Sequence, residues 1–337
     1  MRKGINGREI VINPKLNKIG IITSGGDSPG MNGAIRAIVR VAIYNNLQVI
    51  GFKRGYKGII DKDYIEMTAR SVSGILQRGG TILGSSRCKE FHQEEGRQRA
   101  AENLDALEIN ALFIIGGNGS MRGAAELLKI WDGQIIGLPG TIDNDCGGTD
   151  FTIGFFTALN TALESIDKIR DTAEAFDRIF LIEVMGRKAG DIALGVGITS
   201  GAEEMLLPEK PFDIDQIADR IAKSKERGKG SYIIIVAEGA YDGGAPQLSK
   251  ELEKKVGYAC RPVVLGHIQR GGSPVSMDRW YATRMGAFAV KAALDGANGV
   301  MVGVEKQALV LSPLEKTWLE NKPFDPFIFE IQPMLSI

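Results

Sequence analysis

Two aspartates stand two residues apart in the segment Pro139–Asp145, which reads PGTIDND. If this segment is extended, Asp143 and Asp145 point to the same side, because side chains alternate along a strand. One carboxylate of such a pair can act as a general base and the other as a ligand of a divalent cation. The alternative is an ordinary turn rich in Asp and Asn, and the spacing alone does not decide between the two.

Two glycine-rich segments, Gly25–Gly30 (GGDSPG) and Gly116–Ser120 (GGNGS), offer places for phosphate groups. Each follows a short apolar run and precedes a helical pattern, so backbone N–H groups and a helix N-terminus favour an anion there. Met31 and Asn32 stand where a P-loop has Lys and Ser or Thr, so this is not a P-loop. A plain tight turn accounts for one or two glycines, whereas two such loops at different strand ends favour a nucleotide phosphate chain.

Further charged residues follow other apolar runs, namely Arg187, Glu238, His267 and Arg270. His267 and Arg270 lie one helical turn apart if their loop coils, and together they could clamp a phosphate. A single His or Arg is more often structural or at the surface. Only the convergence of these residues favours a binding site.

The elements that must position these groups alternate between short apolar strands and longer amphipathic helices. Strands are expected at Lys18–Ile22, Ala111–Ile115, Gln134–Leu138, Arg178–Val184, Tyr232–Ala237 and Pro262–Leu265. The helix after the first glycine-rich segment has one apolar face, and the helix after the second is expected through Ala124–Ile130. This alternation predicts an α/β fold with a mainly parallel sheet, which binds ligands at the carboxyl ends of its strands, where the glycines cluster.

The composition is that of an ordinary globular protein and narrows the partners. The 337 residues, 44% hydrophobic and 24% charged, suffice for one large or two medium domains. Lys plus Arg and Asp plus Glu both number 41, which argues against nucleic-acid or membrane binding through overall charge. The three cysteines form no CxxC pattern, and the start of the chain has no apolar core of signal-peptide length, so we expect a cytoplasmic protein.

Taken together, these segments resemble the phosphofructokinase family. They recur in family order over roughly residues 18–310 and read ITSGGDSPGMNGAIR, GGTILGSSR, IGGNGS, GLPGTIDNDCGGTDFTIGFFTAL, EVMGRKAGD and VLGHIQRGGSP. The match is best with the short bacterial homotetrameric type, and PGTIDND and GHIQRGGSP are its most specific parts. The resemblance implies two similar three-layer lobes with mainly parallel sheets and the active site in the cleft between them.

The resemblance further implies an N-terminal extension (1–17), an ATP-binding lobe (18–153 plus about 269–318) and a sugar-phosphate-binding lobe (154–268 plus about 319–337). The implied reaction is transfer of the γ-phosphate of ATP to the 1-hydroxyl of fructose 6-phosphate, a step of glycolysis. Asp143 is implied as the base, and Arg187, Arg87 and Thr141 complete the catalytic set. The residues implied to line ATP are Gly26, Arg87, Cys88, Asn118, Gly119, Ser120 and Met121.

The groups implied to hold the sugar phosphate are Thr141, Ile142, Asp143, Met185, Gly186, Arg187, Glu238, His267 and Arg270. Arg178 and Arg261 match positions that reach into a neighbouring subunit's site, so a homotetramer is implied. An effector site for ADP or phosphoenolpyruvate is implied at Arg36, Arg40, Arg170, Gly201, Glu203, Arg227 and Lys229. For any one of these charges, a solvated surface position is the alternative.

The chain departs from the family pattern at Asn118, where members usually carry an Asp that helps to hold Mg²⁺. The resemblance implies Mg²⁺ at Asn118 and Asp145, and the amide oxygen of Asn is a weaker ligand for a hard cation than a carboxylate. Three outcomes are open. The remaining carboxylates and the ATP phosphates suffice, which we favour; metal affinity falls; or the chain keeps binding and has lost catalysis.

Gly119 and Gly140 favour ATP over pyrophosphate as the donor, because pyrophosphate-using relatives carry Asp and Lys at these positions, where they would crowd ATP. The alternatives are a pyrophosphate-dependent enzyme, a kinase for another sugar phosphate such as sedoheptulose 7-phosphate, and a nucleotide-binding regulatory homologue disabled at Asn118. A lipid or NAD kinase shares a GGDG-type loop but leaves the PGTIDND and GHIQRGGSP segments unexplained.

Overall fold

The chain folds into two compact units in a computed structural model that describes residues 16–175, 178–320 and 322–335. Unit 1 comprises the residues up to Phe156 together with Arg270–Lys322, and unit 2 comprises Thr157–Gln269 and the residues from Pro323 on. Nearly all of the expected N-terminal extension (1–17) lies outside the described residues. The assignment of ATP to one unit and the sugar phosphate to the other stays a prediction.

The sheet of unit 1 has seven strands in the order β11-β10-β5-β4-β1-β2-β3. Their bounds are Lys18–Ser24 (β1), Gln48–Phe52 (β2), Tyr64–Glu66 (β3), Ala111–Gly116 (β4), Gln134–Pro139 (β5), Val300–Glu305 (β10) and Ala308–Pro313 (β11). The five inner strands run parallel, and the two edge strands β3 and β11 pair antiparallel with their neighbours. Every residue of β4 is buried, as expected for a parallel strand covered on both faces.

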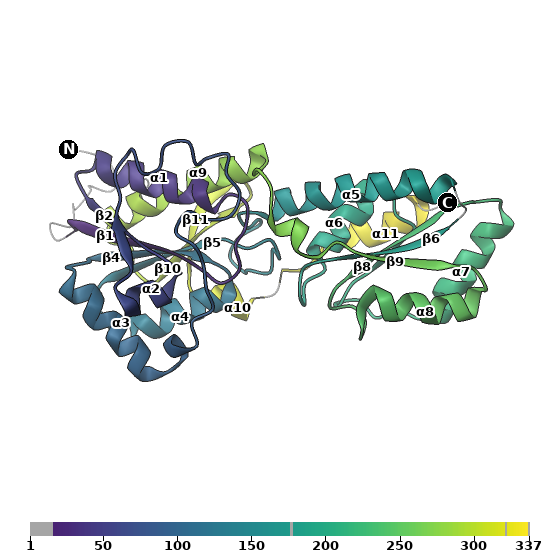
Figure 1. The fold of residues 1–337 in the computed structure, drawn as a ribbon, viewed down its shortest axis with the longest axis horizontal. Coiled ribbons are helices and arrows are strands. Elements are labelled where there is room, and N and C mark those ends of the chain that lie inside the picture. The colour runs from purple at the N-terminus through teal and green to yellow at the C-terminus, as the bar shows by residue number, and fades with distance from the viewer. Residues whose placement is uncertain (1–15, 176–177, 321, 336–337) are drawn as a thin grey trace. The chain divides into compact units, whose positions relative to one another are not determined.

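Helices cover both faces of this sheet, so unit 1 has three layers (Figure 1). On one face lie α1 (Met31–Tyr44) and α9 (Ser276–Leu294), which pack against each other; on the other lie α2 (Tyr56–Asp61), α3 (Glu94–Ala106) and α4 (Asn118–Leu128). Two buried apolar clusters, one per face, hold the layers together. The short helices η1 (Glu90–His92) and α10 (Lys316–Leu319) complete this unit.

Unit 2 is built on a four-stranded, wholly parallel sheet in the order β7-β8-β6-β9. The strands span Ile179–Val184 (β6), Glu204–Leu206 (β7), Tyr232–Ala237 (β8) and Cys260–Val264 (β9). Figure 1 shows α5 (Phe155–Ala175) and α6 (Asp191–Ser200) on one face and α7 (Ile214–Glu226) and α8 (Gly244–Val256) on the other. The remaining helices are η2 (Gly266–Arg270) and α11 (Pro326–Leu335).

Each sheet contains a point at which the strand order reverses. In unit 1 the chain passes from β1 to β2 on one side and returns to β4 on the other side of β1; in unit 2, β8 and β9 flank β6 in the same way. Open α/β sheets bind ligands outside the carboxyl ends of the strands at such a switch point. In unit 1 the switch point lies between β1 and β4, and one glycine-rich segment follows each of these strands.

The predicted α/β fold with mainly parallel sheets is confirmed in each unit, and β8 has the predicted bounds. The helix expected through Ala124–Ile130 is wrong in its bounds: α4 already begins at Asn118, because the N–H of Met121 donates to the carbonyl of Gly117 and closes the first turn there. Within the described residues, no helix is long and apolar enough to cross a membrane. The position of the active site in a cleft between the lobes stays a prediction.

Candidate active site

The loops that follow β1, β4 and β5 lie side by side in unit 1. The N–H of Gly140 donates to the carbonyl of Gly116 at 3.0 Å, which joins the ends of β5 and β4. A Cβ at Gly116 would lie only 2.5 Å from both Ser120 Oγ and the carbonyl oxygen of Ser24, so β1 and the start of α4 approach this glycine closely. The two glycine-rich segments and the aspartate-containing segment therefore share one edge of the sheet.

Tyr56 stabilises the first turn of α4 through a hydrogen bond to its backbone. Its hydroxyl donates to the carbonyl oxygen of Ser120 at 2.7 Å, and its ring stacks on Phe91 with centroids 3.9 Å apart. Burial raises the pKa of Tyr56 above its usual value. The sequence does not indicate this role of Tyr56, since a tyrosine in an apolar stretch carries no signal of it.

Asp143 lies in a bend after β5, and its side chain is buried. Asn144 adopts φ of 55°, so the backbone turns between the two aspartates. The expectation that Asp143 and Asp145 share one side of an extended segment is therefore wrong, because alternation does not apply across a bend. The backbone therefore forms a turn, as in the alternative interpretation of this segment. The buried side chain of Asp143 distinguishes this turn from an ordinary surface turn.

Thr152 closes the loop that carries Asp143. Its N–H donates to Asn144 Oδ1 at 3.0 Å, and its hydroxyl donates to the carbonyl oxygen of Thr141 at 2.6 Å. The N–H of Asp143 in turn donates to Thr141 Oγ1 at 3.2 Å. Side chains within the loop therefore fix the backbone on both sides of Asp143.

We expect Thr152→Val to destabilise the protein by about 1–3 kcal/mol, because it leaves a buried carbonyl of Thr141 without its donor. The change keeps the shape of the side chain and can be read from the urea midpoint. Thr199→Val is the matched control, since the Thr199 hydroxyl donates to Gly195 within an exposed helix turn. Equal effects of the two variants would contradict the role of Thr152.

The same loop is tied to the first glycine-rich segment and to α9. Ser28 Oγ donates to the carbonyl oxygen of Ile153 at 2.9 Å, and the N–H of Gly154 donates to the buried carboxylate of Asp278 at 2.8 Å. Gly154 has φ of 107°, and a Cβ there would lie 2.5 Å from Ser28 Cβ. Only glycine fits at position 154, because any larger residue would clash with Ser28. The loop that carries Asp143 can therefore pack closely against the first glycine-rich segment.

Asn118 and Asp145 meet at the start of α4. Asn118 Nδ2 donates to Asp145 Oδ2 and to the carbonyl oxygen of Asp145, both at 3.1 Å. Asn118 Oδ1 is buried and accepts no hydrogen bond from the described residues. The residue types fit Mg²⁺, which takes one or two protein oxygens as ligands and completes its shell with phosphate and water. In this orientation, however, the amide presents its nitrogen rather than its oxygen to Asp145.

The other residues implied to contact ATP lie around these loops. Arg87 is exposed, Cys88 is half-buried, and Gly26 is covered by Arg270, whose guanidinium donates to the carbonyl oxygen of Asp27 at 3.0 Å. Met121 and Ile142 are fully buried among core side chains, so only their backbone can face a ligand. Arg270, expected at the sugar phosphate, thus belongs to unit 1 and contacts the glycine-rich segment.

In unit 2 the loops after β6, β8 and β9 are also joined. The N–H of Met185 donates to Gln269 Oε1 at 2.9 Å, and the N–H of Arg187 donates to Glu238 Oε1 at 2.6 Å. The expected coil through His267 is confirmed as η2. Met185, Gly186, Arg187, Glu238 and His267 therefore gather at the carboxyl ends of these strands. Gln269, which is fully buried and holds Met185, had not been singled out from the sequence.

Arg178 and Arg261 lie at the opposite end of the same sheet. Arg178 precedes β6, and Arg261 pairs with Phe180 near the start of β9. The six residues of β6 lie between Arg178 and Met185, so the two are seven steps apart, about 23 Å at 3.3 Å per residue. These two arginines therefore do not join the carboxyl-end cluster of their own chain.

The family pattern described as Phosphofructokinase matches residues 18–293, most of the chain. The chain belongs to the phosphofructokinase family. Two similar proteins are ATP-dependent 6-phosphofructokinase 1 of Thermus thermophilus, 49% identical, and ATP-dependent 6-phosphofructokinase of Thermotoga neapolitana, 47% identical. The alignments cover 96% and 95% of this chain and all of each relative.

A solved structure of the family has the same fold. Pichia pastoris phosphofructokinase in the T-state superposes with a TM-score of 0.85 at 35% identity over 95% of this chain. The match covers 39% of the Pichia chain, so that protein is much longer. The resemblance read from the sequence is thus confirmed at the level of the family, including the short bacterial type.

The two glycines that bear on the phosphoryl donor have different surroundings in this phosphofructokinase. A Cβ at Gly119 would have no atom of the described residues within 4 Å, so that position is open among them. A Cβ at Gly140 would lie 2.8 Å from Ile115 Cγ2 and 3.1 Å from Met31 Cε. Packing alone therefore requires glycine at 140, and Gly119 is the cleaner position for testing the donor.

The implied effector residues of this phosphofructokinase fall in both units. Arg36 and Arg40 lie on α1 in unit 1, and the others lie in unit 2, where Arg227 directly follows α7. Glu203 is buried and pairs with Lys229 at 2.8 Å, while Arg170 donates to the carbonyl oxygens of Ser200 and Gly201. Unit 2 therefore brings together Glu203 with Lys229 and Arg170 with Gly201.

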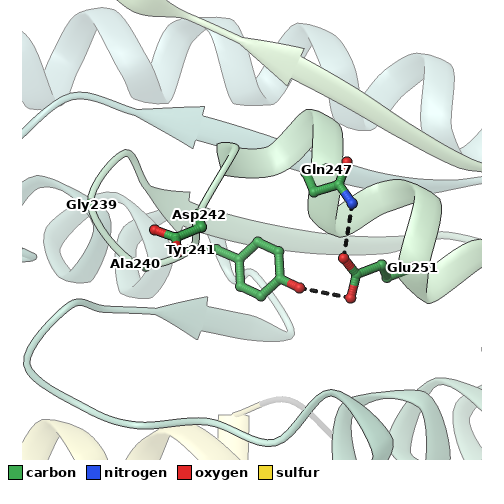
Figure 2. A pocket seen from close by; sticks show the side chains of 6 residues that line it. All are labelled: Gly239, Ala240, Tyr241, Asp242, Gln247 and Glu251. Atoms are coloured by element: carbon green, nitrogen blue, oxygen red, sulfur yellow. Dashed lines mark hydrogen bonds between the residues drawn. The ribbon is translucent and has the colours of Figure 1, made fainter.

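A shallow pocket begins one residue after Glu238 (Figure 2). It is lined by Gly239, Ala240, Tyr241, Asp242, Gln247 and Glu251. Tyr241 and Gln247 both donate to Glu251, at 2.7 and 3.0 Å, and the hydrogen bond from Tyr241 lowers the pKa of Glu251. Two carboxylates disfavour a phosphate, so this pocket does not extend the sugar-phosphate cluster.

Proposed function

We propose that this phosphofructokinase transfers the γ-phosphate of ATP to the 1-hydroxyl of fructose 6-phosphate, giving fructose 1,6-bisphosphate and ADP. The observation that carries the proposal is the buried Asp143, held beside two glycine-rich loops at the switch point of a chain of this family. Relatives that match along their whole length are named ATP-dependent 6-phosphofructokinase, which supports both the acceptor and the donor.

Asp143 accepts the proton of the sugar 1-hydroxyl as that oxygen attacks the γ-phosphorus. The bond from the γ-phosphorus to the β,γ-bridging oxygen breaks, and ADP leaves. Arg87 and Arg187 supply positive charge toward the phosphoryl group, and backbone N–H groups at the start of α4 face the phosphates. The protein contributes mostly positioning and charge neutralisation, because phosphoryl transfer needs little covalent chemistry from it.

Mg²⁺ bound at Asp145 and Asn118 would neutralise the charge of the ATP phosphates. The carboxyl-end cluster of unit 2 is the proposed holder of the sugar phosphate, and the family resemblance adds Thr141 and Arg270 of unit 1 to this set. Arg187 and His267 are exposed there, so both can reach a ligand in solution.

Donor exchange tests the proposal. We expect fructose 1,6-bisphosphate to form with ATP and Mg²⁺ and not with pyrophosphate and Mg²⁺. Turnover with pyrophosphate would overturn the assignment of the donor, and faster turnover of sedoheptulose 7-phosphate than of fructose 6-phosphate would overturn that of the acceptor. Binding of ATP without turnover of any sugar phosphate would instead support the regulatory homologue.

We further propose that Arg178 and Arg261 serve the active site of a neighbouring copy in a homotetramer. Their separation from the carboxyl-end cluster supports this, since one chain offers them no route to its own sugar phosphate. Light scattering at assay concentration should show an oligomer. Arg261→Ala should raise the KM for fructose 6-phosphate by about tenfold to a hundredfold, the usual worth of a charged hydrogen bond.

Co-expression separates a shared site from a local effect. Arg261→Ala chains combined with Asp143→Asn chains should recover activity well above the sum of the two, because some sites receive both intact residues. Asp143→Asn combined with Arg87→Ala is the matched control without recovery, since both belong to one chain's site. An active monomer would refute the shared site.

The effector site for ADP or phosphoenolpyruvate stays a proposal, supported by the pair of Lys229 with the buried Glu203 and by Arg170, which donates to the carbonyls of Ser200 and Gly201. The expected cytoplasmic location is likewise a prediction. Allosteric regulation would appear as a shift of the fructose 6-phosphate saturation curve on adding either compound.

A further inference from the structure

The contact between Asn118 and Asp145 has an unusual balance of donors and acceptors. The amide nitrogen of Asn118 donates to two oxygens of Asp145, one of its carboxylate and one of its backbone carbonyl, each at 3.1 Å. The other end of the same amide, Oδ1, is buried and accepts no hydrogen bond from the described residues. The described residues thus give Asp145 two hydrogen bonds and give the amide oxygen of Asn118 no donor.

The opposite orientation of the amide is disfavoured in the protein alone. Turning the group by half a rotation about its Cβ–Cγ bond would bring Oδ1 against two oxygens of Asp145 and remove both hydrogen bonds. The assignment of nitrogen and oxygen therefore follows from the hydrogen-bond network. A divalent cation beside Asp145 reverses this preference, because it binds oxygen and repels the amide hydrogens.

We propose that Asn118 locks Asp145 in place in the absence of a divalent cation, and that the free protein consequently binds such a cation weakly. The amide must first give up two hydrogen bonds before its oxygen can become a ligand. The cation then enters together with the phosphates of the nucleotide, a step that rests on the proposed function. Asn118 is in this sense a positioning residue for Asp145.

A carboxylate at position 118 would act in the opposite way. Two carboxylates about 3 Å apart repel each other without a cation and form a strong pair of ligands with one. With asparagine at position 118, the loop that carries Asp145 is held in place without a metal ion. The same contact lowers the affinity of the site for a divalent cation.

The test compares Asn118→Asp with the wild-type protein, with Mn²⁺ as the probe and no nucleotide or sugar present. Asn103→Asp is the matched control, because Asn103 also donates twice through Nδ2, to the carbonyls of Ile59 and Ile60, with no carboxylate as partner. Melting temperatures are recorded in EDTA and in Mn²⁺, and bound Mn²⁺ is counted by electron paramagnetic resonance.

We expect Asn118→Asp to melt about 2 °C lower than wild type in EDTA and to recover in Mn²⁺. Its affinity for Mn²⁺ should exceed that of wild type by at least about tenfold, since affinity follows the number of charged ligands. Asn103→Asp should melt lower in both conditions. If Asn118→Asp folds only in Mn²⁺, the lock is supported as well.

Equal Mn²⁺ affinity of Asn118→Asp and wild type would overturn the proposal, and so would a variant that stays unfolded in Mn²⁺. None of these measurements needs turnover. They therefore test the proposed role of Asn118 even if the protein fails to phosphorylate fructose 6-phosphate. Conversely, a failed lock leaves the kinase assignment untouched.

Discussion

Asp143→Asn is expected to lower kcat for phosphoryl transfer by about two to four orders of magnitude, the usual worth of a general base. Asparagine has the shape of aspartate and keeps the backbone contacts of the loop, in which the N–H of residue 143 donates to Thr141 and Thr152 holds Thr141 and Asn144. The melting temperature and the Kd for ATP should therefore change little. Steady-state kinetics with saturating ATP and fructose 6-phosphate measure the effect.

Asp132→Asn is the matched control, because Asp132 is an exposed aspartate of the same unit, between α4 and β5. Near-normal turnover of Asp143→Asn would remove this residue from the role of base. A large loss accompanied by a lower melting temperature would instead point to damage of the loop, which the comparison with Thr152→Val would reveal.

Gly119→Asp is expected to lower kcat/KM for ATP by about tenfold to a hundredfold, because it places a carboxylate beside a bound polyphosphate. The fold should tolerate the side chain, since a Cβ at this position would meet no atom within 4 Å in the part of the chain that the structure describes. A carboxylate in the first turn of α4 even favours the helix dipole. Gly119→Asp should thus lower kcat/KM for ATP while leaving the melting temperature of the protein nearly unchanged.

Gly119→Asn serves as the matched control, since it has the same shape and lacks the charge. It should keep most of the activity with ATP. An equal loss in both variants would show that size rather than charge matters at position 119, and full activity of Gly119→Asp would place the phosphates elsewhere.

The sequence predicted the framework of the site well because strand and loop signals are local. The apolar run Tyr232–Ala237 coincides with β8, and the glycines after β1 and β4 flank the switch point of unit 1. The apolar face predicted for the first helix is confirmed by the burial of Ile35, Ile38 and Val39 in α1.

Details that depend on which side chains meet in the folded chain could not be predicted. The bend at Asn144 is held by Thr152, and the amide of Asn118 turns toward Asp145, 27 positions away. Alternation along an extended segment gave the wrong relation between Asp143 and Asp145 because one residue with positive φ suffices to break it. Tyr56 supports Ser120 across 64 positions, and its type alone gives no such indication.

The sequence predicted Arg178 as the first residue of a strand and Met185 just after its end, and the structure begins this strand, β6, one residue later at Ile179. Because a strand lies between them, Arg178 and Met185 are at opposite ends of the sheet. Whether Arg178 serves the site of another subunit depends on how the copies assemble, which the sequence of one chain does not give. The shared site therefore rests on the family resemblance and on the complementation test.

The most direct test of the proposed reaction is phosphorus NMR of a mixture of the protein, fructose 6-phosphate, ATP and Mg²⁺. We predict equimolar appearance of ADP and of a sugar bisphosphate with its new phosphate on the 1-oxygen, and no such signal when pyrophosphate replaces ATP. No new sugar phosphate from a protein that still binds ATP, or a product phosphorylated at another carbon, would contradict the assignment.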